Sequence, residues 1–176
     1  MLANKWRPRS GRERGNVTLE IAITLPLLLL IVAGIIDLGI LFWEQEILTN
    51  ASREGARAGA RAGLSGLPRI KPGDTTNTTA TAVMAVVQNY LTKYNLRDAG
   101  GAPLTLVKGT NFFYQWTLGV GTNPATLWVE LRNIPVKMML LPNIAPLVRG
   151  TFTNIVNVDV KTTMTAEWNN ATPPVP

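Results

Sequence analysis

The sequence predicts an α+β protein with a long N-terminal helix, a second helix and an antiparallel sheet of about four strands. Residues 19–43 form a nearly continuous apolar run, and small residues recur every fourth position just after it. Further along, apolar residues at helical spacing give way to alternation with period two after residue 101. This order of elements favours a sheet with helices on one face.

Composition excludes several kinds of chemistry. The 176 residues include no cysteine and no histidine, which rules out disulfides, thiol chemistry and the usual zinc sites. No nucleophile elbow, phosphate-binding loop or paired carboxylate is present, so we expect a non-enzyme without metal or cofactor. The net charge is +6, and residues 1–15 account for +4 of it, because this segment has five basic residues and one acidic residue, Glu13. Because the basicity is confined to this leader, no nucleic-acid partner is expected.

The apolar run has the length of a membrane span. Leu19 to Trp43 is about 25 residues, more than the ~20 that cross a bilayer. Basic residues precede the run and Glu44 and Glu46 follow it, so the positive-inside rule places the N-terminus in the cytoplasm. A secretory signal peptide is the alternative, but the run exceeds the ~7–15 residues of an ordinary apolar region of that kind.

Glu20 is unusual at the start of this run, because a carboxylate deep in a membrane helix costs ~2.5–3.5 kcal/mol and less near the interface. An isolated Glu20 could still reach the headgroups. Gly15 followed five residues later by Glu20 resembles the prepilin processing site of type IV pilins. The resemblance implies that a prepilin peptidase cleaves between Gly15 and Asn16. Glu20 would then pair with the new amine of a neighbouring subunit and set its register in a filament.

Two further blocks narrow the resemblance. "GIIDLG" at residues 34–39 and "NASREGAR" at residues 50–57 are similar to segments of TadE-like pseudopilins of Tad (Flp) pilus systems, as is Leu25-Pro26. Ile21 departs from the Tyr of major Flp pilins, which favours a minor subunit. The implied partners are other pilus subunits, the inner-membrane assembly platform and the lipid bilayer.

Two more positions in the run are assigned to subunit assembly. Pro26 removes one helical hydrogen bond, and it is either a tolerated kink or a hinge for packing in a filament. Asp37 is expected to be hydrated near the outer interface, and its position in the TadE-like block implies contact with a cation of a partner subunit.

Residues 44–63 are predicted to continue the helix as an amphipathic arm. One ridge carries small residues that allow close packing, namely Ala51, Gly55, Gly59 and Gly63. A second ridge carries Arg53, Arg57 and Arg61. This second ridge is either solvated or meets acidic groups or lipid phosphates of neighbours.

Residues 64–170 are predicted to form an external α+β domain, and residues 171–176 a flexible tail. Turn-forming residues indicate a loop at 64–79, and apolar spacing indicates a helix over 80–94. Alternation predicts strands near 112–120, 127–132 and 156–168. The proline-rich apolar segment 134–148 is either a loop over the sheet edge or a contact patch.

Three functional hypotheses follow from the resemblance and the residues. The chain is a cleaved minor pseudopilin, an uncleaved single-pass assembly factor, or an anchored module for binding or adhesion. The expected location is the bacterial inner membrane with the C-terminal domain outside the cytoplasm, and the extracellular pilus is a second destination. Whether the pilus serves adhesion, secretion or DNA uptake stays open at this point.

Overall fold

The computed structural model describes residues 11–61, 78–117 and 123–167. It divides into two compact units. The stem unit comprises Met1–Leu38 and Met139–Asn154, and the head unit comprises Gly39–Met138 and Ile155–Pro176. Most of the leader, Gly63, the loop expected before the second helix and the tail at 171–176 lie outside the described residues.

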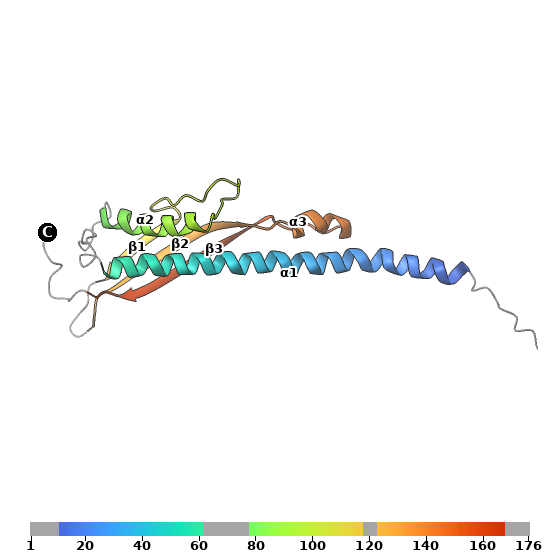
Figure 1. The fold of residues 1–176 in the computed structure, drawn as a ribbon, viewed down its shortest axis with the longest axis horizontal. Coiled ribbons are helices and arrows are strands. Elements are labelled where there is room, and N and C mark those ends of the chain that lie inside the picture. The colour runs from blue at the N-terminus through green and yellow to red at the C-terminus, as the bar shows by residue number, and fades with distance from the viewer. Residues whose placement is uncertain (1–10, 62–77, 118–122, 168–176) are drawn as a thin grey trace, which may run out of the picture. The chain divides into compact units, whose positions relative to one another are not determined.

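Helix α1 runs from Gly11 to Ala60 and confirms the long N-terminal helix (Figure 1). Pro26 lies inside it without ending it. In the part that belongs to the stem unit, most side chains from Val17 to Leu38 are exposed although they are apolar. Such a surface is unfavourable in water and favourable in lipid.

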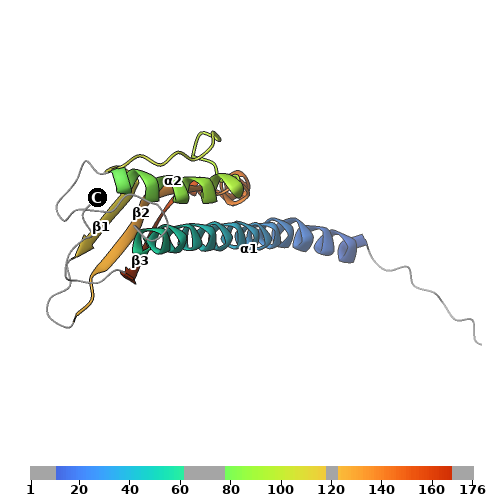
Figure 2. The same cartoon turned by 60° about the vertical axis from the view of Figure 1, so that its left-hand side comes forward.

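The head unit contains the second helix and the sheet (Figure 2). Helix α2 spans Thr78–Lys93, and three strands follow: β1 (Phe112–Thr117), β2 (Thr126–Lys137) and β3 (Ile155–Thr165). Their order is β1-β2-β3, and both pairs are antiparallel. The helix predicted at 80–94 is therefore confirmed, as is the mixed α+β class.

In the part of the chain that the structure describes, the sheet has three strands, whereas about four were predicted. Residues 134–137, which the sequence predicts to be part of a loop or a contact patch, continue β2 beyond an irregularity between Leu131 and Ile134. Pro135 is tolerated there because this end of β2 pairs with β3 alone, whereas β1 pairs only with Thr126–Leu131. The prolines therefore do not mark the end of the strand.

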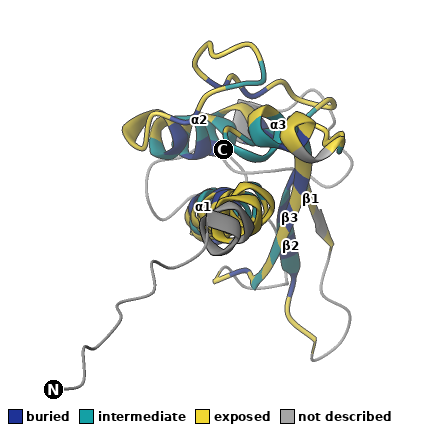
Figure 3. Cartoon of the chain, turned by 90° about the vertical axis from the view of Figure 1, so that its right-hand side faces the viewer, coloured by how far each residue is buried: buried dark blue, intermediate teal, exposed yellow. Residues whose placement is uncertain are grey.

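The core of the head unit lies between the helices and one face of the sheet (Figure 3). Leu127, Val129 and Leu131 alternate along β2 as buried residues, while Trp128 and Glu130 on the other face are less buried. The helices contribute Leu48 from α1 and a line of apolar residues from α2, namely Val83, Val87 and Leu91. The last part of α1 is therefore a core element of the head unit.

The stem unit adds a short irregular segment to α1. Helix α3 spans Leu141–Ile144, and the 3-10 turn η1 spans Ala145–Val148. Both belong to the segment whose placement the sequence left open. The segment divides between the two units: residues 134–138 belong to the head unit, where Ile134 and Val136 are buried, and residues 139–148 belong to the stem unit.

Candidate functional site

In the described part of the stem unit, the Asp37 carboxylate is buried and accepts several backbone hydrogen bonds. Its side chain is only 2% exposed. One carboxylate oxygen accepts hydrogen bonds from the backbone N–H groups of Met139 and Leu140, both at 3.1 Å. The other oxygen accepts from Leu140 at 3.0 Å and from Leu141 at 2.6 Å. Three consecutive N–H groups thus surround one carboxylate.

These bonds place Asp37 at the start of α3, where Leu140 is the N-cap residue and has no side-chain cap of its own. The first N–H groups of any helix lack intrahelical acceptors, and Asp37 supplies them from another part of the chain. The expectation that Asp37 is hydrated is therefore wrong. Backbone donors take the place of water, and the carboxylate is already engaged inside its own chain.

Glu20 is in the opposite situation. It lies on the same helix, and its side chain is exposed among Leu19 and Ile21, which are also exposed. The segment 139–154 that supplies the partners of Asp37 does not bury Glu20. Of the two acids in the apolar run, one has its hydrogen bonds within the monomer and the other stays on the surface.

The remaining predicted processing and assembly residues are spread along α1. Gly15 and Asn16 lie in its first turns, and Pro26 is half-buried. Glu20 and Pro26 are six residues apart, or ~9 Å at the helical rise, and Pro26 and Asp37 are eleven apart, or ~17 Å. These residues therefore form separate positions along one helix and do not make up a single pocket.

The small-residue ridge of the arm packs inside the head unit. A methyl group on Gly55 would overlap Val87 of α2 and lie 3.6 Å from Val129 of β2. A methyl group on Gly59 would lie 3.1 Å from the ring and hydroxyl of Tyr114. The described part of the ridge is thus buried against α2 and the sheet, which accounts for Gly55 and Gly59.

The arginine ridge lies on the outside. Arg53 and Arg57 are exposed, and Arg61 pairs with Glu167 at 3.0 Å. Both side chains of that pair are close to half exposed, so the pair adds at most ~1 kcal/mol to stability. Of the two arm ridges, the arginine ridge is the exposed one.

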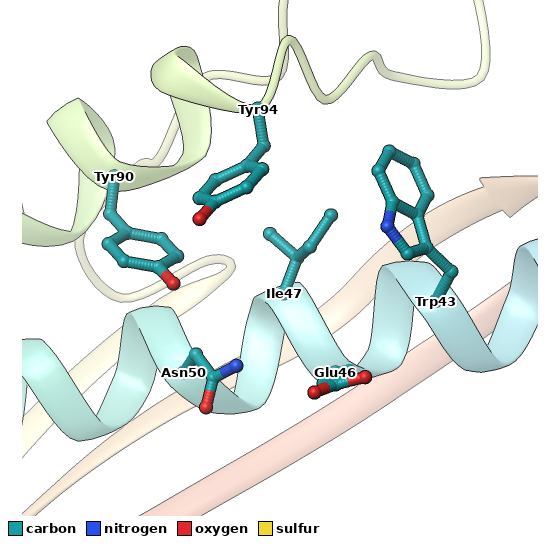
Figure 4. A pocket seen from close by; sticks show the side chains of 6 residues that line it. All are labelled: Trp43, Glu46, Ile47, Asn50, Tyr90 and Tyr94. Atoms are coloured by element: carbon teal, nitrogen blue, oxygen red, sulfur yellow. The ribbon is translucent and has the colours of Figure 1, made fainter.

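A pocket between α1 and α2 was not predicted from the sequence. It has a volume of about 160 Å³ and is lined by Trp43, Glu46, Ile47, Asn50, Tyr90 and Tyr94. Figure 4 shows Tyr90 of α2 and Tyr94, the residue after this helix, on one side of Ile47 and Trp43 of α1 on the other. The tyrosine rings are 5.0 Å apart, and a hydrogen bond with Tyr94 raises the pKa of Tyr90. The i, i+4 spacing of these residues on each helix is the signal that could have revealed it.

Together, the fold and these sites are compatible with a membrane-anchored protein that has a folded head unit. One helix is long and apolar enough to cross a membrane, and its C-terminal part forms the core of an α+β head unit. Within the described residues, no group of three or more acidic, histidine or cysteine side chains is placed to hold a metal.

A comparison with family models identifies the N-terminal part more closely. Residues 15–57 match the model described as TadE-like protein. The TadE-like resemblance of this segment is confirmed, and it indicates a pilus-associated protein in which α1 is compatible with a membrane anchor. The match lies along α1 and includes none of α2 or the sheet. Searches of curated proteins and of solved structures gave no significant match.

Proposed function

We propose that this protein is a minor pseudopilin of a Tad/Flp-type pilus. A prepilin peptidase cleaves it after Gly15, and the mature chain joins the pilus as a non-catalytic structural subunit. The family match supports this proposal because it begins at Gly15 and runs along the part of α1 that carries Glu20. The N-terminus is cytoplasmic and the head unit lies outside the inner membrane.

The contrast between the two acids of the apolar run, Glu20 and Asp37, carries the proposal. Asp37 has three backbone donors within its own chain, whereas Glu20 is exposed on an apolar surface. A carboxylate in lipid is stabilised by an opposite charge close to it. Cleavage after Gly15 creates such a charge, the ammonium group of Asn16. In an assembly, the ammonium group of Asn16 in one subunit can approach the Glu20 carboxylate of a neighbouring subunit.

Mapping the mature N-terminus tests the processing step. We expect mass spectrometry of the protein from cells with an active prepilin peptidase to find Asn16 as the first residue. Cells that lack the peptidase should retain Met1. The variant Gly15→Leu should stay uncleaved, because its bulk replaces the glycine of the processing site. An intact leader in wild-type cells would exclude the pseudopilin assignment.

The variant Glu20→Ala tests the pairing step. It should insert in the membrane at least as well as the wild type, because a carboxylate has been removed from the span. It should be depleted from sheared filaments, because the opposite charge for the amine is lost. Glu54→Ala, which removes an exposed carboxylate from the arm, is the matched control. Normal recovery of Glu20→Ala in filaments would contradict the pairing.

The location of the chain separates the proposal from its main alternative. A structural subunit is found in sheared filaments, whereas an assembly factor that stays in the bilayer is found in membrane fractions alone. Recovery of a fully cleaved chain in membranes alone would keep the processing step and overturn the role in the fibre.

A further inference from the structure

The segment beside Asp37 suggests a second contact with the membrane. We propose that residues 139–148 form a wedge inserted into the outer part of the lipid bilayer beside α1, with Asp37 as its attachment point. The inference rests on α1 crossing the membrane, as in the proposed function. The lipid-inserted segment, residues 139–148, is called the wedge below.

The position of the wedge along α1 is the first argument. Leu19 and Asp37 are 18 residues apart, which is ~27 Å at the helical rise, compared with ~30 Å for the hydrocarbon layer. Asp37 therefore lies just inside the outer boundary of this layer. Gly34 is nearly one turn closer to the bilayer centre, and a methyl group there would lie 3.9 Å from Leu141. The wedge thus extends from Asp37 toward the membrane interior.

The covered face of α1 agrees with this position. Leu30, Ala33, Gly34 and Asp37 follow one another at i, i+3, i+4 and i+7, and all are buried or half-buried. Their neighbours Ile31, Ile35 and Ile36 are exposed. Because residues 139–154 are the other part of the stem unit, they provide this cover.

The backbone of the wedge is suited to lipid. Irregular backbone enters the hydrocarbon layer only where its polar groups have partners. The N–H groups of Met139, Leu140 and Leu141 bind Asp37. Those of Asn143, Ile144 and Ala145 donate to carbonyl groups at the start of α3. Pro142 and Pro146 have no N–H group to satisfy. Every backbone N–H from 139 to 146 thus has an acceptor.

The exposed apolar side chains of the wedge also favour a lipid environment. Met139 is 60% exposed and Leu147 is 65% exposed. The side-chain amide of Asn143 donates to the backbone carbonyl of Met139 at 2.7 Å, so that this N–H and this carbonyl oxygen satisfy each other. Arg149, the first charged residue after the wedge, is exposed and can reach lipid phosphates.

Lipid fits this surface better than a second protein chain does. The exposed apolar residues continue from the wedge to several sides of the adjoining helix, including Ile31, Ile35, Ile36 and Leu38. A second protein chain would cover one side, whereas lipid covers all of them. Asp37 and the three N–H groups would each be costly in hydrocarbon alone, and together they satisfy one another.

Fluorescence quenching in vesicles tests the wedge directly. The chain has no cysteine, so each single-cysteine variant carries one label. Bimane is placed on Leu147→Cys in the full chain, reconstituted in vesicles of phosphatidylethanolamine and phosphatidylglycerol. We expect strong quenching by lipids that carry a nitroxide on the acyl chain, and little quenching by aqueous iodide. Ile31→Cys on α1 should behave in the same way. Asn89→Cys on the exposed side of α2 should show the reverse pattern.

A second substitution tests the role of Asp37. In the background of Leu147→Cys, Asp37→Ala should release the wedge and move the label toward water, so that quenching by iodide rises and quenching by lipid falls. Asp159→Ala, which removes a carboxylate that accepts one backbone N–H in the head unit, is the matched control and should leave the label in place. If quenching of the label by lipid and by iodide is unchanged in the Asp37→Ala protein, Asp37 is not the attachment point of the wedge.

The labels also separate failure of the wedge from failure of the membrane span. If Ile31→Cys is quenched by lipid and Leu147→Cys by iodide, the wedge is overturned and the span stands. If neither quencher reaches Leu147→Cys, protein covers the segment and the wedge is again overturned. If lipid fails to quench Ile31→Cys, the proposed anchor itself is wrong.

Discussion

At the scale of single residues, the interior of the head unit depends on glycine at two positions of α1. Gly55 lies against Val87, and Gly59 lies against Tyr114. The spacing of these glycines in the sequence predicted close packing. It could not show that the partners are α2 and the sheet of the same chain, because a ridge of small residues fits any apolar surface.

Gly55→Ala should destabilise the head unit by ~1–3 kcal/mol, because the added methyl group overlaps Val87 in a packed core. Gly39→Ala is the control, since a methyl group there meets nothing within 4 Å. The control should be neutral or slightly stabilising through its higher helix propensity. Denaturant unfolding of both variants in the same detergent measures the difference. Equal stability of the two would refute the close contact.

Tyr114 offers a prediction of the opposite sign. Its hydroxyl is buried, and no group among the described residues bonds to it. Burial also raises the pKa of Tyr114, because the charged form is poorly solvated there. Tyr114→Phe should therefore leave stability unchanged or increase it by about 1 kcal/mol, since an unpaired polar group is removed. A loss of more than that in thermal unfolding would reveal a partner for the hydroxyl.

At the scale of elements, the sequence predicted what has a repeating pattern. The length of the apolar run and the spacing of small residues located α1, and the period of apolar residues located α2 and much of the three strands. The prediction failed at residues 133–137, because a bulge shifts the alternation of β2 and Pro135 is more typical of a loop than of a strand. It also failed at Asp37, since its partners are 102 to 104 positions away and are backbone groups, which no side-chain pattern reveals.

The bulge in β2 can be tested at Asn133. This residue has a φ of 53°, and its N–H donates to the carboxylate of Asp159 on β3 at 2.7 Å. Glycine accepts this left-handed conformation, so Asn133→Gly should be nearly neutral. Asn133→Val should cost ~1–2 kcal/mol, because a β-branched residue is strained there. Thermal unfolding of the two variants compares them directly. Tolerance of valine would mean that the bulge lies elsewhere.

At the scale of the whole molecule, the expected boundary between arm and external domain does not coincide with the compact units. The head unit begins at Gly39, and its core includes Ile47, Leu48 and Ala56 of α1. Residues 64–170 alone would leave one face of the sheet without this cover. The sequence could not reveal this, because a helix that ends in a core and one that ends in water show similar small-residue patterns.

A fragment of residues 39–176 should fold with a cooperative unfolding transition, whereas residues 64–176 should not. The shorter fragment lacks the part of α1 that fills the core. Circular dichroism during thermal unfolding and binding of a hydrophobic dye distinguish the two. Cooperative unfolding of the shorter fragment would show that the sheet and α2 are sufficient on their own.

The last turns of α1 contribute interior residues to the head unit, among them Leu48, Ala51 and Ala56. A pull applied to the last turns of α1 would therefore act on Leu48 and its neighbours directly. Resistance to that force then comes from many side-chain contacts that must break together, so extraction by tension and loss of the folded head become the same event.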